Sequence, residues 1–159
     1  MSLEPEVQAL SQSHFFRDIA AQRLKLLAFM SDVVLYRTGE TVCEQGDEGD
    51  TAYFILEGEA NIVINTPDGP QVAATVSSQD IVGEIAMLCD IPRTAGIVAK
   101  TDLRIMVITR EAFFNLMNEF PEVSMKVIRL LAERLENTTR DLADVRGRYN
   151  TLMQSSGTS

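Results

Sequence analysis

Residues 83–95 read Gly-Glu-Ile-Ala-Met-Leu-Cys-Asp-Ile-Pro-Arg-Thr-Ala, the most informative stretch of the chain. This stretch places Glu84 and Arg93 in a mainly apolar segment, where a charge is costly unless it has a partner. Residues 84–88 are compatible with a short helix, and the first turn of a helix attracts anions through its unpaired N–H groups. With Arg93 beside that helix start, the stretch predicts a phosphate pocket in which Glu84 accepts a hydrogen bond from a sugar hydroxyl. The alternative is that Glu84 and Arg93 simply pair with each other.

Short strands and turns surround this stretch. Between Val33 and Thr109, turn residues recur about every 8–12 positions, a spacing typical of an antiparallel sandwich or barrel. The expected strands are residues 33–36, 41–43, 52–56, 60–65, 71–76 and 103–108. We expect Glu57-Gly58 to join two of them as a tight hairpin, and Pro67-Asp68-Gly69-Pro70 to form an exposed hairpin tip.

Helical patterns lie on both sides of the strands. Residues 7–30 carry apolar side chains at spacings of three or four, which predicts helical structure. Thr109 is a suitable N-cap for a further helix. The last helix is expected to begin at Pro121, because proline suits the first helical position, and no other proline interrupts the chain up to residue 152.

The last helix carries a repeat of its own. Seven of its residues follow alternating spacings of four and three, as in the seam of a coiled coil: Leu131, Leu135, Thr138, Leu142, Val145, Tyr149 and Leu152. Gly147 weakens the pattern, since glycine destabilises a helix interior. We therefore expect a homodimer formed through residues 131–152, the alternative being a helix packed on its own domain.

Composition excludes several classes of function. The chain has 159 residues, of which 45% are hydrophobic and 23% charged, which suits one soluble domain with a core. A net charge of −9 argues against a nucleic-acid surface. No apolar run approaches the ~20 residues that span a bilayer, and the start of the chain lacks the pattern of a signal peptide. We therefore expect a cytoplasmic protein without membrane or direct nucleic-acid binding.

A metal-dependent enzyme of the cupin type is also excluded. His14 is the only histidine, so a cupin-type site with two or three histidines is impossible. Cys43 and Cys89 lie far apart, without the spacing of metal ligands. We expect no enzyme activity, no metal and no cofactor.

Several spaced motifs together resemble the cyclic nucleotide-binding domain family, over roughly residues 13–145. They are YRTGE at 36–40, QGDEGD at 45–50, YFILEG at 53–58, GEIAML at 83–88 and PRTA at 92–95. The resemblance implies a mainly β fold, a double-stranded β-helix or jelly-roll barrel with N-terminal helices and a long C-terminal lid helix. It also implies that cAMP or cGMP lies against the short helix.

The resemblance sets the expected domain organisation. Residues 1–12 form an N-terminal segment, and residues 13–153 form the cyclic nucleotide-binding domain. Within that domain the barrel covers about residues 33–109, and the lid and dimer helix covers about residues 121–153. Residues 154–159 are expected to be a disordered tail.

The resemblance also assigns roles to residues of the short stretch. Glu84 would bind the ribose 2′-hydroxyl, and Arg93 would pair with the cyclic phosphate. Close backbone approach and N–H donors would come from Gly83, Ile85, Ala86 and Ala95.

Three threonines bear on the choice of nucleotide. Thr94 follows the arginine, where a hydroxyl can bind phosphate or the amino group of guanine. Thr138 and Thr139 match lid-helix positions that contact adenine in the family, one of them from the partner subunit, although both also suit an exposed helix surface. The two lid threonines favour cAMP over cGMP.

The expected function is a non-catalytic cyclic nucleotide sensor and regulatory domain that signals through its C-terminal helix to an unknown downstream protein. Val82 replaces a phenylalanine that is common in the family, and no helix-turn-helix pattern follows the lid helix. Two alternatives stay open. One is a degenerate member, or one that binds a different anion, acting as a protein interaction module. The other is a regulatory fragment of a larger transcription factor, channel or kinase.

Overall fold

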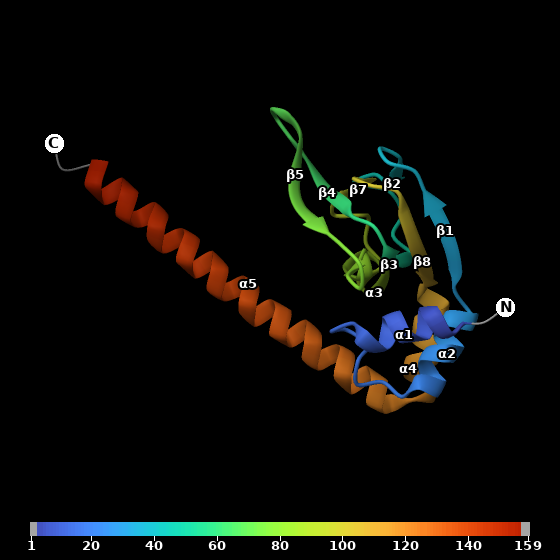
Figure 1. Cartoon of the computed structure of the whole chain (residues 1–159). Coiled ribbons are helices and arrows are strands. Elements are labelled where there is room, and N and C mark those ends of the chain that lie inside the picture. The colour runs from blue at the N-terminus through green and yellow to red at the C-terminus, as the bar shows by residue number, and fades with distance from the viewer. Residues whose placement is uncertain (1–2, 157–159) are drawn as a thin grey trace. The chain divides into compact units, whose positions relative to one another are not determined.

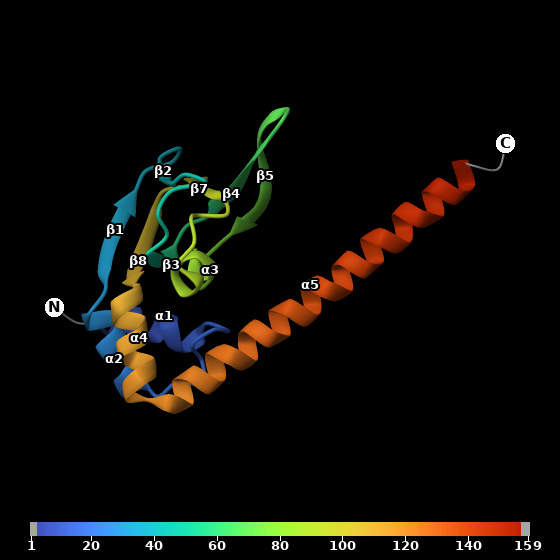
Figure 2. The ribbon, with the colours of Figure 1, turned by 180° about the vertical axis from the view of Figure 1, so that it is seen from behind.

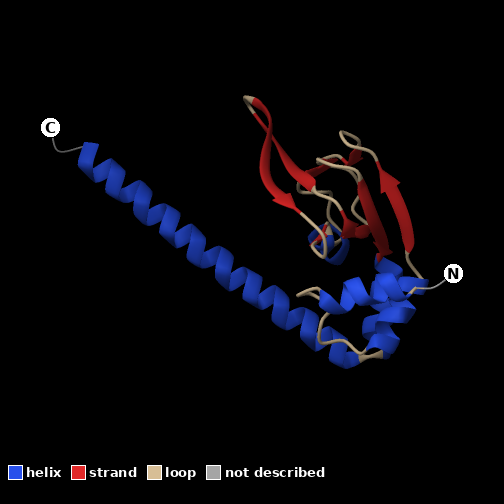
Figure 3. Cartoon of the chain, viewed as in Figure 1, coloured by secondary structure: helices blue, strands red, loops and turns tan. Residues whose placement is uncertain are grey.

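A computed structural model describes residues 3–156. These residues form two compact units, divided between Phe120 and Pro121. The first unit combines a β-sandwich with helices, and the second consists of helix α5 (Pro121–Ser156). Figure 1 labels the elements, and Figure 3 distinguishes helices from strands.

The sandwich consists of two four-stranded sheets in which neighbouring strands run antiparallel. The first sheet has the order β1 (Asp32–Tyr36), β8 (Leu103–Thr109), β3 (Thr51–Glu57) and β6 (Ile81–Val82). The second has the order β2 (Thr41–Cys43), β7 (Gly96–Ala99), β4 (Ala60–Thr66) and β5 (Gly69–Val76). The expected mainly β, jelly-roll architecture with N-terminal helices and a long C-terminal helix is confirmed. The strands β6 and β7 were not predicted.

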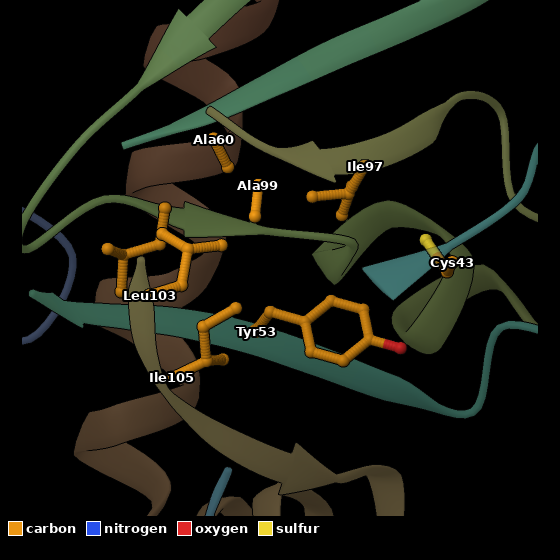
Figure 4. Close-up of a cluster of buried hydrophobic side chains, with 8 residues drawn as sticks. Cys43, Tyr53, Ala60, Ile97, Ala99, Leu103 and Ile105 are labelled. Carbon is orange, nitrogen blue, oxygen red and sulfur yellow. The ribbon is translucent and has the colours of Figure 1, made fainter. Parts of the chain in front are cut away.

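The core lies between the two sheets. Figure 4 shows side chains of the first sheet facing those of the second. The buried cluster consists of Tyr53, Ile55, Leu103 and Ile105 from the first sheet and Cys43, Ala60, Ile97 and Ala99 from the second. Strand β3 is buried on both of its faces, which explains its continuous apolar sequence.

Helices cover the other face of the first sheet. Figures 1 and 2 show α1 (Glu4–Gln12), α2 (Ala21–Phe29) and α4 (Arg110–Glu119) gathered at one end of the sandwich. The ring of Phe16 meets that of Phe54 edge to face, with centroids 5.9 Å apart. Thr109 caps α4 as predicted, because its side chain accepts a hydrogen bond from the Ala112 N–H at 3.1 Å.

The helical pattern predicted over residues 7–30 is divided between two helices, α1 and α2. The hydroxyl of Ser13 donates a hydrogen bond to the Leu10 carbonyl at 2.7 Å and accepts one from the Phe16 N–H at 3.1 Å. Such side-chain bonds compete with the helical ladder and end α1 at Gln12.

The prediction of a hairpin at Glu57-Gly58 is wrong, because β3 and β4 belong to different sheets. The chain turns a tight corner there instead. Gly58 has a φ of 98°, and a Cβ on it would lie 2.2 Å from the Asp102 carbonyl oxygen. The second predicted hairpin is confirmed, since Thr66 and Gly69 face each other across the β4–β5 turn.

Helix α5 carries the exposed stripe that the heptad spacing indicated. Its exposed large apolar side chains include Leu135, Leu142, Val145, Tyr149 and Leu152. The helix includes residues 154–156, which we expected to belong to a disordered tail, and the remaining tail residues, 157–159, lie outside the described part of the chain. Within residues 3–156, no helix is both long and apolar enough to cross a membrane.

Candidate functional site

The short helix predicted from the sequence is α3 (Glu84–Cys89). Gly83 precedes it with a φ of 79°, in the left-handed region that favours glycine. Glu84 is its first residue and is only 5% exposed. Gly49 of the β2–β3 loop touches α3 so closely that a Cβ there would lie 2.4 Å from the Ala86 Cβ. The start of α3 is therefore set by a left-handed glycine and a close backbone approach.

Arg93 reaches the site from the segment between α3 and β7. Its backbone is tied to the β2–β3 loop, since its N–H donates to the Asp47 carbonyl at 2.7 Å and its carbonyl accepts from the Gly46 N–H at 2.9 Å. The residue is only 4% exposed. This fixed backbone directs the guanidinium into the protein beside α3.

The guanidinium of Arg93 is held by three oxygens. One terminal nitrogen, Nη1, donates to the Gly83 carbonyl at 3.1 Å, and the other, Nη2, donates to the Thr51 hydroxyl at 2.8 Å and the Tyr53 hydroxyl at 3.3 Å. The Arg93 Cζ also lies 4.9 Å from the centroid of the Tyr53 ring. These contacts hold the positive charge at the N-terminal end of α3.

The electrostatics of this arrangement point to an anion. The three oxygens that accept hydrogen bonds from the Arg93 side chain are neutral, and its Nε is buried without a hydrogen-bond partner among residues 3–156. A buried charge is costly unless it is compensated, and a buried unpaired donor adds to that cost. An anion bound beside Nε would supply both the missing acceptor and the opposite charge.

The predicted site residues fall into two groups. The structure brings the start of α3, with Gly83, Glu84, Ile85 and Ala86, next to the Arg93 guanidinium through the bond to the Gly83 carbonyl. Thr94, which is exposed, and Ala95, which is half-buried, follow Arg93 and lead into β7.

The two remaining candidates belong to the other unit. Thr138 and Thr139 are exposed residues of α5. The Thr139 hydroxyl donates a hydrogen bond to the Leu135 carbonyl of the same helix at 2.8 Å.

Sequence reasoning missed two residues of the site, Thr51 and Tyr53. Both lie on β3, two positions apart, so their side chains leave the strand on the same face. A hydroxyl pair at that spacing next to a buried arginine is informative only once the fold is known.

The two cysteines are expected to differ in reactivity. Cys43 is buried, and burial raises the pKa of its thiol, although the nearby Arg93 acts in the opposite direction. Cys89, the last residue of α3, is exposed. Because the thiolate is the reactive form, iodoacetamide near neutral pH should alkylate Cys89 first and leave Cys43 largely unmodified. Mass spectrometry of tryptic peptides over time checks this order, and equal labelling of the two cysteines would contradict it.

The fold and the site together define a β-sandwich domain with a buried arginine beside the start of a short helix. The family profile of the cyclic nucleotide-binding domain matches residues 33–120. The chain therefore belongs to the cyclic nucleotide-binding domain family.

Curated relatives include bacterial and fungal proteins. The chain is 29% identical over 139 residues to a CRP-like cAMP-activated global transcriptional regulator of Mycobacterium tuberculosis, covering 87% of this chain and 62% of the relative. It is 36% identical over 92 residues to a cAMP-dependent protein kinase regulatory subunit of Aspergillus niger, covering 58% of this chain and 22% of that subunit. The chain thus spans less than two thirds of the length of these relatives.

Solved structures with the same architecture include two from bacterial regulators. The N-terminal domain of a transcriptional regulator from Streptomyces coelicolor aligns with a TM-score of 0.72 and 28% identity, covering 82% of this chain and 94% of that one. The catabolite activator protein of Thermus thermophilus aligns with a TM-score of 0.75 and 25% identity, covering 83% of this chain and 62% of that one.

Proposed function

We propose that this chain is a non-catalytic sensor that binds a 3′,5′-cyclic nucleotide at the start of α3. The observation that supports this most strongly is the Arg93 guanidinium, buried among neutral acceptors with its Nε unpaired. In the proposal the cyclic phosphate accepts hydrogen bonds from Arg93 and from N–H groups at the start of α3. Glu84 accepts a hydrogen bond from the ribose 2′-hydroxyl, the only free hydroxyl of such a nucleotide.

The remaining roles complete the proposed site. Gly83, Ile85, Ala86 and Ala95 supply close backbone approach and N–H donors, and Thr94 adds a hydroxyl beside the phosphate. Thr138 and Thr139 of α5 contact the base, one of them in the partner subunit.

We propose cAMP rather than cGMP as the ligand. The two relatives described above are named for cAMP, as a cAMP-activated regulator and as a subunit of a cAMP-dependent kinase. The two threonines of α5 are polar groups that suit contact with an adenine edge.

The signal in this proposal passes through α5. Binding shifts the population of α5 positions, and the new position is read by the second subunit of a homodimer or by a downstream protein. The chain itself binds neither nucleic acid nor membrane. A cytoplasmic location accords with its two widely separated cysteines, one of which is buried as a free thiol.

Thermal unfolding with a panel of ligands tests this function. Cyclic AMP is expected to stabilise the chain more than cGMP, and 5′-AMP, which has an open phosphate and a free 3′-hydroxyl, is expected to do little. A ligand at about 100 times its Kd adds ~2.7 kcal/mol to the free energy of unfolding, which gives a clear rise in Tm. The same unfolding temperature with cAMP, cGMP and buffer would contradict the proposal.

Dimer formation through α5 makes a separate prediction. Leu142 is exposed in the single chain and lies in the heptad seam. Leu142→Lys should therefore bury a charge at the proposed interface, and the variant should be monomeric in sedimentation velocity. Asn137→Lys adds the same side chain on the opposite side of the helix and should leave the dimer intact. Dimers that persist in Leu142→Lys, or a monomeric wild type, would contradict this interface.

A further inference from the structure

Arg110 occupies an unusual place for a cation. It is the first residue of α4, where the partial positive charge of the helix start disfavours a positive side chain. Its side chain is nevertheless only 28% exposed. The position therefore indicates a role that lies outside α4.

The side chain of Arg110 reaches the C-terminal end of α3. Its Nε donates a hydrogen bond to the Met87 carbonyl at 2.6 Å, and its Nη2 lies 2.9 Å from the Asp90 carboxylate. The same nitrogen makes a long contact of 3.4 Å with the Gly49 carbonyl. Its backbone N–H donates to the Asp50 carbonyl at 2.9 Å, so Arg110 also holds the β2–β3 loop.

The hydrogen bond from Arg110 is electrostatically favourable at the C-terminal end of α3. The last carbonyls of a helix lack partners within it and carry partial negative charge, which a guanidinium can satisfy. Asp90 ends α3 in the left-handed conformation, with its N–H bonded to the Ala86 carbonyl, and Arg110 binds the next carbonyl, that of Met87. A helix of six residues is too short to be stable alone, so its position depends on such contacts.

The two ends of α3 are thus held by two arginines. Arg93 binds the carbonyl that precedes the helix, at the proposed phosphate, and Arg110 binds a carbonyl in its last turn. Arg110 also begins α4, and a single residue, Phe120, separates the end of α4 from the start of α5. A shift of α3 on binding a phosphate would therefore pull on the Arg110 side chain, and through it on the first residue of α4, for as long as the bond to the Met87 carbonyl is kept.

We propose that Arg110 is a positioning residue that couples the occupancy of the site at α3 to α4, an inference that rests on the proposed function. It acts through the Met87 carbonyl rather than through Asp90. The Asp90 side chain is 84% exposed, and an ion pair to so exposed a group contributes little. Asp90→Asn should therefore preserve the coupling that Arg110→Gln removes.

Hydrogen exchange of the ligand-free chain gives the first test. Arg110→Gln should speed the exchange of the α3 amides of Met87 and Asp90 about tenfold, the scale for losing a hydrogen bond to a charged donor. The control is Arg104→Gln, since Arg104 is a comparable arginine of β8, 30% exposed, that pairs with Glu6 and Glu57 instead. Unchanged α3 exchange in Arg110→Gln, or an equal effect of Arg104→Gln, would overturn the inference.

Exchange with saturating cAMP gives the second test. Wild type and Asp90→Asn should show slower exchange on binding both in α3 and at residues 112–116 of α4. In Arg110→Gln the slowing should persist in α3 and be lost in α4, a pattern that mere destabilisation does not produce. An α4 response that survives the substitution would overturn the proposed coupling.

The two proposals can fail separately. A wild type that does not bind cAMP removes the proposed function, and the ligand-free exchange then decides on its own whether Arg110 holds α3. If Arg110→Gln does not fold, Arg110→Lys takes its place with the same readouts. A lysine keeps the charge but lacks the planar fork, so it should weaken the coupling in the same direction.

Discussion

Arg93→Ala is expected to reduce the free energy of cyclic nucleotide binding by ~2–5 kcal/mol, the scale for truncating one partner of a buried charge pair. The reason is that Arg93 is the buried cation beside the start of α3, and its Nε is the donor that lacks an acceptor. Each ~1.4 kcal/mol corresponds to a tenfold change in Kd, so binding falls by more than an order of magnitude. Calorimetric titration of wild type and variant with cAMP measures the loss.

Two controls accompany this experiment. Arg93→Lys keeps the charge but lacks the planar fork that reaches the Gly83 carbonyl and the Thr51 hydroxyl, so it should give an intermediate loss. Arg104→Ala removes an arginine that pairs with Glu6 and Glu57 and should leave the affinity for cAMP unchanged. Equal affinities of Arg93→Ala and wild type would remove Arg93 from the site.

Gly83→Ala is expected to weaken both folding and binding. Gly83 has a φ of 79°, and the left-handed conformation costs an L residue ~1–2 kcal/mol. A Cβ at this position would also lie 2.4 Å from the Arg93 Nη1, so the guanidinium must move out of its place. We expect a lower free energy of unfolding together with about a tenfold or larger loss of cAMP affinity, because ~1.4 kcal/mol of lost contacts corresponds to tenfold.

Gly39→Ala separates these two effects. Gly39 has a similar φ of 87°, but a Cβ there meets nothing within 4 Å. It should therefore lower stability by the conformational cost alone and leave the affinity for cAMP unchanged. Denaturant unfolding and calorimetry of both variants give the comparison, and equal cAMP affinities in the two would show that the position of Arg93 does not depend on Gly83.

Local signals in the sequence predicted most of the strands but not how one of them connects to the next. Strand β6 has only two residues, and the four residues of β7, Gly-Ile-Val-Ala, show no alternation of apolar and polar side chains. Glu57-Gly58 reads like a hairpin because it directly separates two apolar runs. Only the long-range pairing of β3 with β8 and β6 shows that the chain changes sheets at this corner.

In the site, too, contacts within one stretch of sequence could be predicted, whereas contacts between distant segments could not. The proximity of Arg93 to the start of α3 was predicted, because both belong to one stretch of sequence, and the 3.1 Å bond to the Gly83 carbonyl shows it. Thr51 and Arg110 look like ordinary strand and helix residues in the sequence. Their contacts with Arg93 and with Met87 depend on segments that only the folded chain brings together.

Titration calorimetry of the wild-type chain with cAMP tests the central claim most directly, with 5′-AMP and inorganic phosphate as parallel ligands. If the buried guanidinium of Arg93 pairs with a ring-closed phosphodiester, cAMP should bind saturably, with one molecule per chain. Its binding should be much tighter than that of 5′-AMP or inorganic phosphate. No heat of binding with cAMP, or affinities for 5′-AMP or phosphate that match it, would contradict the account.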